Sequence, residues 1–157
     1  MKKFLAFVLT AAMVVAMFAG CAAGTASDGY TANNTEYVIG VSGPLTGDAA
    51  IYGQAVANAA KMAVEEINAA GGLNGIKFKL VAVDDMHDAA KISTNYSSLL
   101  EGGMQLSLGT VTTAPGMEFK NLAKDDNVFF LTPSASGDKI PEFDNGFQMC
   151  FADGNQG

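Results

Sequence analysis

Two short loops rich in Ser and Thr, at Thr110–Pro115 and Thr132–Ser136, constrain the fold of this chain more than any other feature. Each loop follows a short apolar run, QLSLG before the first and VFFL before the second, and one helix-length segment, Ala114–Asp126, lies between them. This order of strand, loop, helix, strand and loop is the repeating unit of a parallel sheet. Ligands of open parallel sheets bind outside the carboxyl ends of the strands. The sequence therefore predicts half of a small-molecule site at these two loops.

The same alternation of strand and helix runs through the rest of the chain. Strands are expected at five apolar segments, namely Glu36–Val41, Lys77–Asp84, Met104–Leu108, Val128–Leu131 and Phe147–Phe151. Helices are expected between them at Gln54–Ala70, at Ala89–Glu101 and from about Thr113 to Asp126, and a weak helical turn is expected after Ser136. We therefore predict an α/β fold with a doubly wound parallel sheet and right-handed crossovers.

Apolar residues at helical spacing predict which face of each helix packs on the sheet. In the first helix they are Ala55, Ala59, Met62, Ala63 and Ile67, which leaves Asn58, Lys61, Glu65 and Asn68 on the solvent side. In the second helix they are Ile92, Tyr96, Leu99 and Leu100, and in the third Met117, Phe119 and Leu122.

The first part of the chain is not expected to belong to the fold. Lys2 and Lys3 precede an uncharged apolar run, Phe4–Phe18, and small residues follow it up to Cys21. This pattern is typical of a secretory signal peptide over residues 1–20. The alternative is a membrane-spanning helix, but the run is shorter than the about 20 apolar residues that a bilayer requires. The small, polar segment of residues 21–36 predicts a flexible tether.

Charge and motifs exclude several classes of function. All nine basic residues are Lys, and the formal net charge is −7. A chain of this kind lacks the basic face that nucleic acids need and the Arg forks that favour phosphate groups. No nucleophile elbow or HExxH motif is present, and His87 is the one histidine. We therefore expect neither catalysis nor a cofactor.

The segment Asp84–Asp88, of sequence DDMHD, admits two interpretations. Its carboxylates and its histidine could bind a metal ion, although their spacing matches no specific motif. The simpler interpretation, which we favour, is a polar loop at the end of a strand in which Asp88 caps the next helix. No metal site is therefore expected.

The two Ser- and Thr-rich loops offer the chemistry that a zwitterion needs. The hydroxyls of Thr112, Thr113, Ser134 and Ser136 both donate and accept hydrogen bonds, and N–H groups at helix starts favour a carboxylate. Loop carbonyls could accept from an ammonium group. Capping of the helices by Ser and Thr is the alternative explanation for each loop, but two such loops after neighbouring strands favour binding.

Two further residues remain open to more than one interpretation. Tyr52 could be a half-buried anchor or could cover the apolar part of a ligand. Cys150 lies in the apolar run FQMCF, where a buried free thiol is expected. Cys21, the other cysteine, is not expected to form a disulfide with it.

The segment of residues 37–157 resembles the first lobe of leucine/isoleucine/valine-type periplasmic binding proteins, which serve ABC importers. The similarity lies in the stretches IGVSGPLTG, IYGQ, AVEEINAAGGLNG, VAVDD, LTPSAS and FADGNQG, in the right order and spacing. It implies the type I fold, in which two α/β lobes close on a ligand. It also implies that the ligand is a free amino acid, expected to be branched-chain, and that the partners are the membrane subunits of a permease. The ligand contacts that it implies are Tyr52, Val111, Thr113, Ser134 and Ser136.

The resemblance carries further expectations. The sequence before Cys21 resembles the bacterial lipobox, which implies a lipid on Cys21 and a monomer anchored to the membrane outside the cytoplasm. Members with a disulfide join the positions of His87 and Thr112, so this chain lacks that bond. The sequence is expected to stop at the crossover to lobe two. Two other functions use the same fold, a ligand-sensing receptor domain and a binding protein for amides, urea or aromatic acids.

Overall fold

The computed structural model describes residues 35–156, so the expected signal peptide, Cys21 and most of the expected tether lie outside the described residues. The chain divides into two units, residues 1–31 and 32–157, and the second contains every element described below. Its centre is a sheet of five parallel strands in the order β2-β1-β3-β4-β5. The strands are β1 (Glu36–Gly43), β2 (Lys77–Asp84), β3 (Leu106–Thr110), β4 (Phe129–Thr132) and β5 (Gly146–Gln148).

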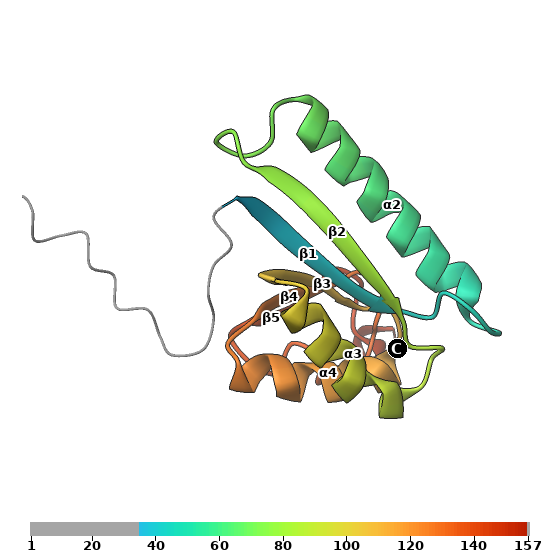
Figure 1. Ribbon diagram of the computed structural model, residues 1–157. Helices are drawn as coiled ribbons and strands as arrows, with labels where there is room; N and C mark the ends of the chain where they lie inside the picture. Colours follow the sequence, from blue (N-terminus) through green and yellow to red (C-terminus); the bar gives the residue numbers. More distant parts are fainter. Residues whose placement is uncertain (1–34, 157) are drawn as a thin grey trace, which may run out of the picture. The chain divides into compact units, whose positions relative to one another are not determined.

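Helices cover both faces of this sheet, which confirms the doubly wound α/β fold. They are α2 (Ala50–Ala69), α3 (Ile92–Glu101) and α4 (Thr113–Asp125), with short 3₁₀ turns η2 (Ala89–Lys91) and η3 (Asp153–Asn155). Figure 1 shows α2 along one face of β1 and β2, and α3 and α4 together on the other face of the sheet. Among residues 35–156, no helix has the length and the apolar character that crossing a membrane would require.

Most element bounds lie within a few residues of their predicted positions. The bounds of β2 are those predicted, and β1 continues two residues further, to Gly43. β3 and β4 begin two residues and one residue later than expected, which brings Thr110 and Thr132 into the strands. The largest difference is at α2, which begins at Ala50 instead of Gln54 and therefore includes Tyr52 in its first turn.

The main core lies between the sheet and the pair α3 and α4. Ile92, Tyr96 and Leu99 are buried there, as the helical spacing predicted. Phe119 of α4 meets Tyr96 and Phe130 in two edge-to-face contacts, with ring centroids 5.2 and 5.7 Å apart. Such pairs add to the hydrophobic free energy of burial, by about 0.5–1.5 kcal/mol each. This core holds the start of α4 against the end of β3, where the predicted site lies.

The predicted buried face of α2 is wrong. The residues that α2 buries are Gly53, Ala60 and Val64, whereas Met62 and Ile67 are 70% and 42% exposed. The physical cause is a polar contact at the end of the helix. The Asn68 side chain accepts a hydrogen bond from the N–H of Phe78 at 2.8 Å and donates one to its carbonyl at 2.7 Å. These bonds to β2 turn the helix so that small residues face the sheet.

Candidate functional site

The loops that follow β1, β2, β3 and β4 surround one pocket of about 570 Å³, a volume typical of small-molecule sites. Parallel strands bring their carboxyl ends to one edge of the sheet, so the four loops lie together. The residues that line the pocket are Tyr52, His87, Val111, Thr112, Thr113, Ala114, Ser134 and Ser136. The structure thus brings together all five residues predicted to contact the ligand, while Cys21 lies outside the described residues.

The start of α4 lines this pocket with Thr113 and Ala114. Thr112 occupies the N-cap position, yet within the described residues its side chain makes no capping hydrogen bond. Helix geometry leaves the first N–H groups of a helix without acceptors inside the helix, and here these belong to Thr113 and Ala114. Pro115, the next residue, has no N–H group. Capping is therefore wrong as the explanation for the first Ser- and Thr-rich loop. These donors, together with the helix dipole, favour a carboxylate at this position.

Two hydrogen bonds join the loop after β3 to the loop after β4. The N–H of Ser136 donates to Thr113 Oγ1 at 3.2 Å, and Ser134 Oγ donates to the carbonyl of Val111 at 2.6 Å. Since Thr113 Oγ1 accepts the Ser136 N–H, its own proton can be donated to a ligand. The Val111 carbonyl keeps a second lone pair that can accept from an ammonium group. The Ser136 N–H itself is already engaged, which leaves its hydroxyl for a ligand.

Thr132 fixes the geometry of both loops from beneath. Its hydroxyl donates to the carbonyl of Thr110 at 2.6 Å and accepts from the N–H of Ala135 at 3.1 Å. Gly109 adopts a φ of +47°, and a Cβ there would lie 3.0 Å from Thr132 Cα. Glycine at this position therefore permits the close approach of the two strand ends.

The loop after β1 is bound to the end of β2 through Asp84. Its carboxylate accepts hydrogen bonds from the N–H groups of Leu45, at 2.8 Å, and Thr46, at 3.3 Å, and from Thr46 Oγ1 at 2.5 Å. Burial alone would raise the pKa of Asp84, but these bonds and one from the Met86 N–H outweigh it, so the pKa is lowered. This connection holds the start of α2, where Tyr52 is 63% exposed instead of half-buried.

Asp85 anchors the next loop from inside the protein. Its side chain is fully buried and accepts hydrogen bonds from Ser42 Oγ at 3.1 Å and from the N–H of His87 at 2.9 Å. Burial raises the pKa of this carboxyl, and the two hydrogen bonds oppose the shift without cancelling it.

The DDMHD segment has the structure of a helix-capping loop. The carboxylate of Asp88 accepts a hydrogen bond from the N–H of Ala90 at 2.9 Å, which confirms its predicted capping role. Within residues 35–156, no group of three or more His, Cys, Asp or Glu side chains is arranged to hold a metal ion.

Three residues of the pocket wall were not among the predicted contacts. They are His87, Thr112 and Ala114. His87 was considered as a metal ligand, and Thr112 as a loop hydroxyl. The positions of His87 and Thr112, which a disulfide joins in some members of the resembling family, both lie on this wall. The feature of the sequence that could have identified His87 and Thr112 as wall residues is their position just after the strands β2 and β3.

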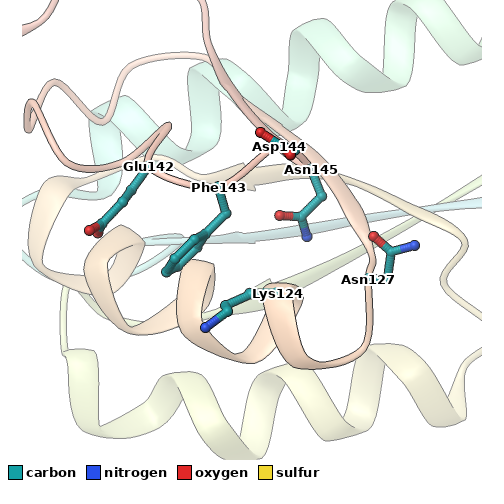
Figure 2. A pocket seen from close by; sticks show the side chains of 6 residues that line it. All are labelled: Lys124, Asn127, Glu142, Phe143, Asp144 and Asn145. Carbon is teal, nitrogen blue, oxygen red and sulfur yellow. The ribbon is translucent and has the colours of Figure 1, made fainter.

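A second depression, of about 420 Å³, lies between the end of α4 and the segment that leads into β5 (Figure 2). Two of its polar side chains have partners within the described residues. The Lys124 Nζ lies 4.7 Å from the centroid of the Phe143 ring, and the Asn145 amide donates to the carbonyls of Ala123 and Val128. The bonds of Asn145 hold the start of β5 against the end of α4.

Cys150 is half-buried, where a buried thiol was expected. Its Sγ lies 3.5 Å from the carbonyl of Ala135.

Comparison with known proteins agrees with this architecture. Residues 36–157 match the family model described as periplasmic binding protein. A Leu/Ile/Val-binding protein homolog of Brucella melitensis is 33% identical over 123 residues, which cover 77% of this chain and 33% of that protein. The leucine-, isoleucine-, valine-, threonine-, and alanine-binding protein of Pseudomonas aeruginosa is 32% identical over 143 residues, which cover 91% of this chain and 35% of that protein.

A solved structure shares the fold and the order of the elements. It is the branched-chain amino acid transporter substrate binding protein LivJ from Streptococcus pneumoniae in complex with isoleucine. The TM-score is 0.71 and the sequence identity is 28%, and the match covers 75% of this chain and 34% of that one. The chain thus spans about a third of the length of the relatives it matches. The family model covers well over half of the chain, and the chain therefore belongs to the periplasmic binding protein family.

Proposed function

We propose that this chain forms the first lobe of an extracytoplasmic solute-binding protein of an ABC importer, which captures a free amino acid and delivers it to the permease. The observation that carries the proposal is the uncapped start of α4, which opens into a pocket lined by hydroxyls. A carboxylate there would take the N–H groups of Thr113 and Ala114, and the hydroxyls of Thr113 and Ser136. An ammonium group would take the carbonyl of Val111.

The names of the relatives support the ligand class. One curated relative is named a Leu/Ile/Val-binding protein homolog, the other is named for leucine, isoleucine, valine, threonine and alanine, and the solved relative holds isoleucine. Branched-chain amino acids are therefore the first candidates. The pocket wall described above recognises the carboxylate and ammonium groups that all amino acids share.

The location and the partners that we propose are those that the resemblance implies. Residues 1–20 would direct export, and a lipid on Cys21 would hold the monomeric protein at the membrane beside the permease subunits. The residues that we propose to contact the ligand are Tyr52, Val111, Thr113, Ser134 and Ser136.

A thermal-shift screen tests this function directly. The protein is produced from its complete reading frame and screened against the common amino acids, and each hit is measured by calorimetry. We expect at least one free amino acid to raise the unfolding temperature, with leucine, isoleucine and valine as the first candidates, because a ligand that binds the folded state stabilises it. Urea, short amides and benzoate serve as the competing ligand classes. If one of these alone bound, or if no amino acid did, the proposal would be wrong.

A further inference from the structure

The residues of the pocket wall follow the order of the strands. His87 comes from the loop after β2, Tyr52 from the helix after β1, Val111–Ala114 from the end of β3, and Ser134 from the loop after β4. Since the strand order is β2-β1-β3-β4, these groups form a row along the edge of the sheet. Neighbouring strands lie about 4.8 Å apart, so the row spans about 14 Å. A carboxylate at α4 therefore leaves the rest of the ligand free to extend toward Tyr52 and His87.

The backbone fixes the position of His87 at some energetic cost. Met86 and His87 have φ angles of +53° and +62°, a left-handed conformation that non-glycine residues rarely adopt. Hydrogen bonds hold this turn in place. The Met86 N–H donates to Asp84 at 2.9 Å, the His87 N–H donates to Asp85 at 2.9 Å, and the Asp88 N–H donates to the Asp85 carbonyl at 2.8 Å. Strain that the surroundings enforce in this way is concentrated at functional sites.

The side chains at this end of the row have unused hydrogen-bonding capacity. Thr112 Oγ1 is buried and has no hydrogen-bond partner among the described residues. Within residues 35–156, neither the imidazole of His87 nor the hydroxyl of Tyr52 forms a hydrogen bond, and both side chains are exposed. Polar groups that a bound ligand desolvates without pairing cost about 1–3 kcal/mol each. A wholly aliphatic ligand side chain would leave all three unpaired.

The charge around His87 selects among polar ligands. Asp84, Asp85 and Asp88 lie within three positions of His87 in the chain, and the carboxylates of Asp84 and Asp85 hold its turn. The whole sequence contains no arginine. A ligand side chain with a second carboxylate would meet this negative field without a guanidinium to balance it. An uncharged amide both donates and accepts hydrogen bonds, so it can pair with the imidazole of His87 and avoids this repulsion.

We propose that His87 is a specificity-determining residue of the site, whose imidazole hydrogen-bonds to the far end of the bound ligand. The ligand class is then amino acids with a long, hydrogen-bonding side chain that carries no negative charge, for which glutamine is the probe. This inference rests on the proposed function, that the site holds a free amino acid, and it names the part of the ligand that the shared carboxylate and ammonium contacts leave undetermined. It replaces the branched-chain side chain that the relatives' names suggest with a polar one.

Two substitutions at this position separate a ligand contact from a structural role. His87→Gly accepts the left-handed backbone and removes the imidazole, while His87→Asn accepts the same backbone and keeps a polar group that donates and accepts. Calorimetry on the protein from its complete reading frame measures leucine, glutamine and glutamate. We expect the wild-type protein to bind glutamine more tightly than leucine or glutamate. His87→Gly should weaken glutamine binding by about tenfold or more, the cost of one lost hydrogen bond to the ligand, and leucine binding by less than about twofold.

His87→Asn should recover part of the glutamine affinity, and thermal unfolding of all three proteins checks that they fold. If leucine binds more tightly than glutamine in the wild-type protein, or if His87→Gly changes both affinities equally, the assignment of His87 is overturned while the proposed function stands. If no amino acid binds the wild-type protein, the proposed function fails, and this inference fails with it.

Discussion

Thr113 is the residue on which the two loops of the site depend most directly. Its hydroxyl accepts the Ser136 N–H, and it lies in the first turn of α4, beside the N–H groups that we assign to the ligand carboxylate. We predict that Thr113→Val, which keeps the shape and removes the hydroxyl, weakens amino-acid binding by about tenfold, the cost of one or two lost hydrogen bonds. Calorimetry measures the change.

The matched control for this variant is Thr113→Ser, which keeps the hydroxyl and should bind within about threefold of the wild-type protein, since the hydrogen bond is retained. Equal affinities for Thr113→Val and the wild-type protein would show that the ligand does not use this hydroxyl.

Asp85 makes the free energy of unfolding depend on pH, and the burial of its carboxyl determines the sign of that dependence. Its pKa in the folded protein lies above the usual value because the carboxyl is buried. The folded state therefore binds this proton more readily than the unfolded state does. The resulting stability is fully present below the unfolded pKa, about 4, and is lost as the pH rises through the folded pKa. We predict that the stability of Asp85→Asn, relative to that of the wild-type protein, increases as the pH rises from 4 to 7.

Urea unfolding at several pH values measures this difference. Asp88→Asn is the control, because Asp88 is exposed and asparagine caps a helix as well as aspartate does. A difference between Asp85→Asn and the wild-type protein that stayed constant with pH would contradict the prediction.

At the scale of elements, α2 lies close to the loop after β1 because of one glycine. A Cβ on Gly53 would lie 2.1 Å from the carbonyl oxygen of Pro44, a backbone atom that cannot move aside easily. We predict that Gly53→Ala destabilises the protein by about 1–3 kcal/mol, the usual cost of overpacking, although alanine favours helices. Thermal unfolding measures it.

Asn58→Ala provides the control in the same helix. Asn58 is exposed, so alanine should leave stability unchanged or raise it slightly. A Gly53→Ala variant as stable as this control would mean that α2 can shift away from Pro44 at no cost.

The sheet face that carries α2 exposes aromatic residues beyond the helix. Phe130 points into the core with α3 and α4, so its neighbour Phe129 points to the other face, where it is 45% exposed. Phe147 of β5 is 49% exposed, and its ring centroid lies 5.3 Å from that of Phe129. Exposed apolar patches of this kind promote association. We predict that the double variant Phe129→Thr and Phe147→Thr lowers self-association of the 157-residue chain.

Sedimentation velocity measures that association. Ile51→Thr is the control, because Ile51 is an exposed apolar residue at the start of α2 on a different element. If the double variant and the control sedimented alike, the aromatic patch would not be the cause of association.

The sequence predicted the buried face correctly for those helices whose spacing of apolar residues allows only one such face. The residues Ile92, Tyr96 and Leu99 have polar neighbours, so their spacing defined the buried face of α3. The helix α2 is rich in alanine and has apolar residues on several faces, and hydrogen bonds between Asn68 and Phe78 decide its rotation. Such a contact joins separate elements and leaves no periodic pattern in the sequence.

The same reasoning explains the candidate site. The Ser and Thr residues were recognisable because they follow apolar strands directly. His87 was not, because its place on the wall requires β2 to lie beside β1, and the order of the strands in the sheet differs from their order in the chain. The choice between capping and binding at Thr112 also depended on a side-chain geometry that the residue type does not determine.

For the whole molecule, the decisive quantity is how much of the binding energy this chain can supply. The pocket is lined by loops from one edge of one sheet, and the chain spans about a third of the length of its relatives. A ligand held on one side keeps much of its surface in water, and ordering it still costs translational and rotational freedom. We predict that the 157-residue chain binds amino acids with a dissociation constant of about 1 mM or weaker. The protein from the complete reading frame should bind at least about a hundredfold more tightly, since under the proposed function a second lobe encloses the ligand.

Calorimetry on both proteins with the same amino acid measures the ratio, and Thr113→Val in each provides the matched control. If this lobe anchors the carboxylate and ammonium groups, the substitution should weaken binding by a similar factor in both proteins, because the contact lies within the chain itself. Tight binding by the 157-residue chain alone would mean that the described wall is sufficient. Loss confined to the longer protein would instead mean that Thr113 acts through closure over the ligand.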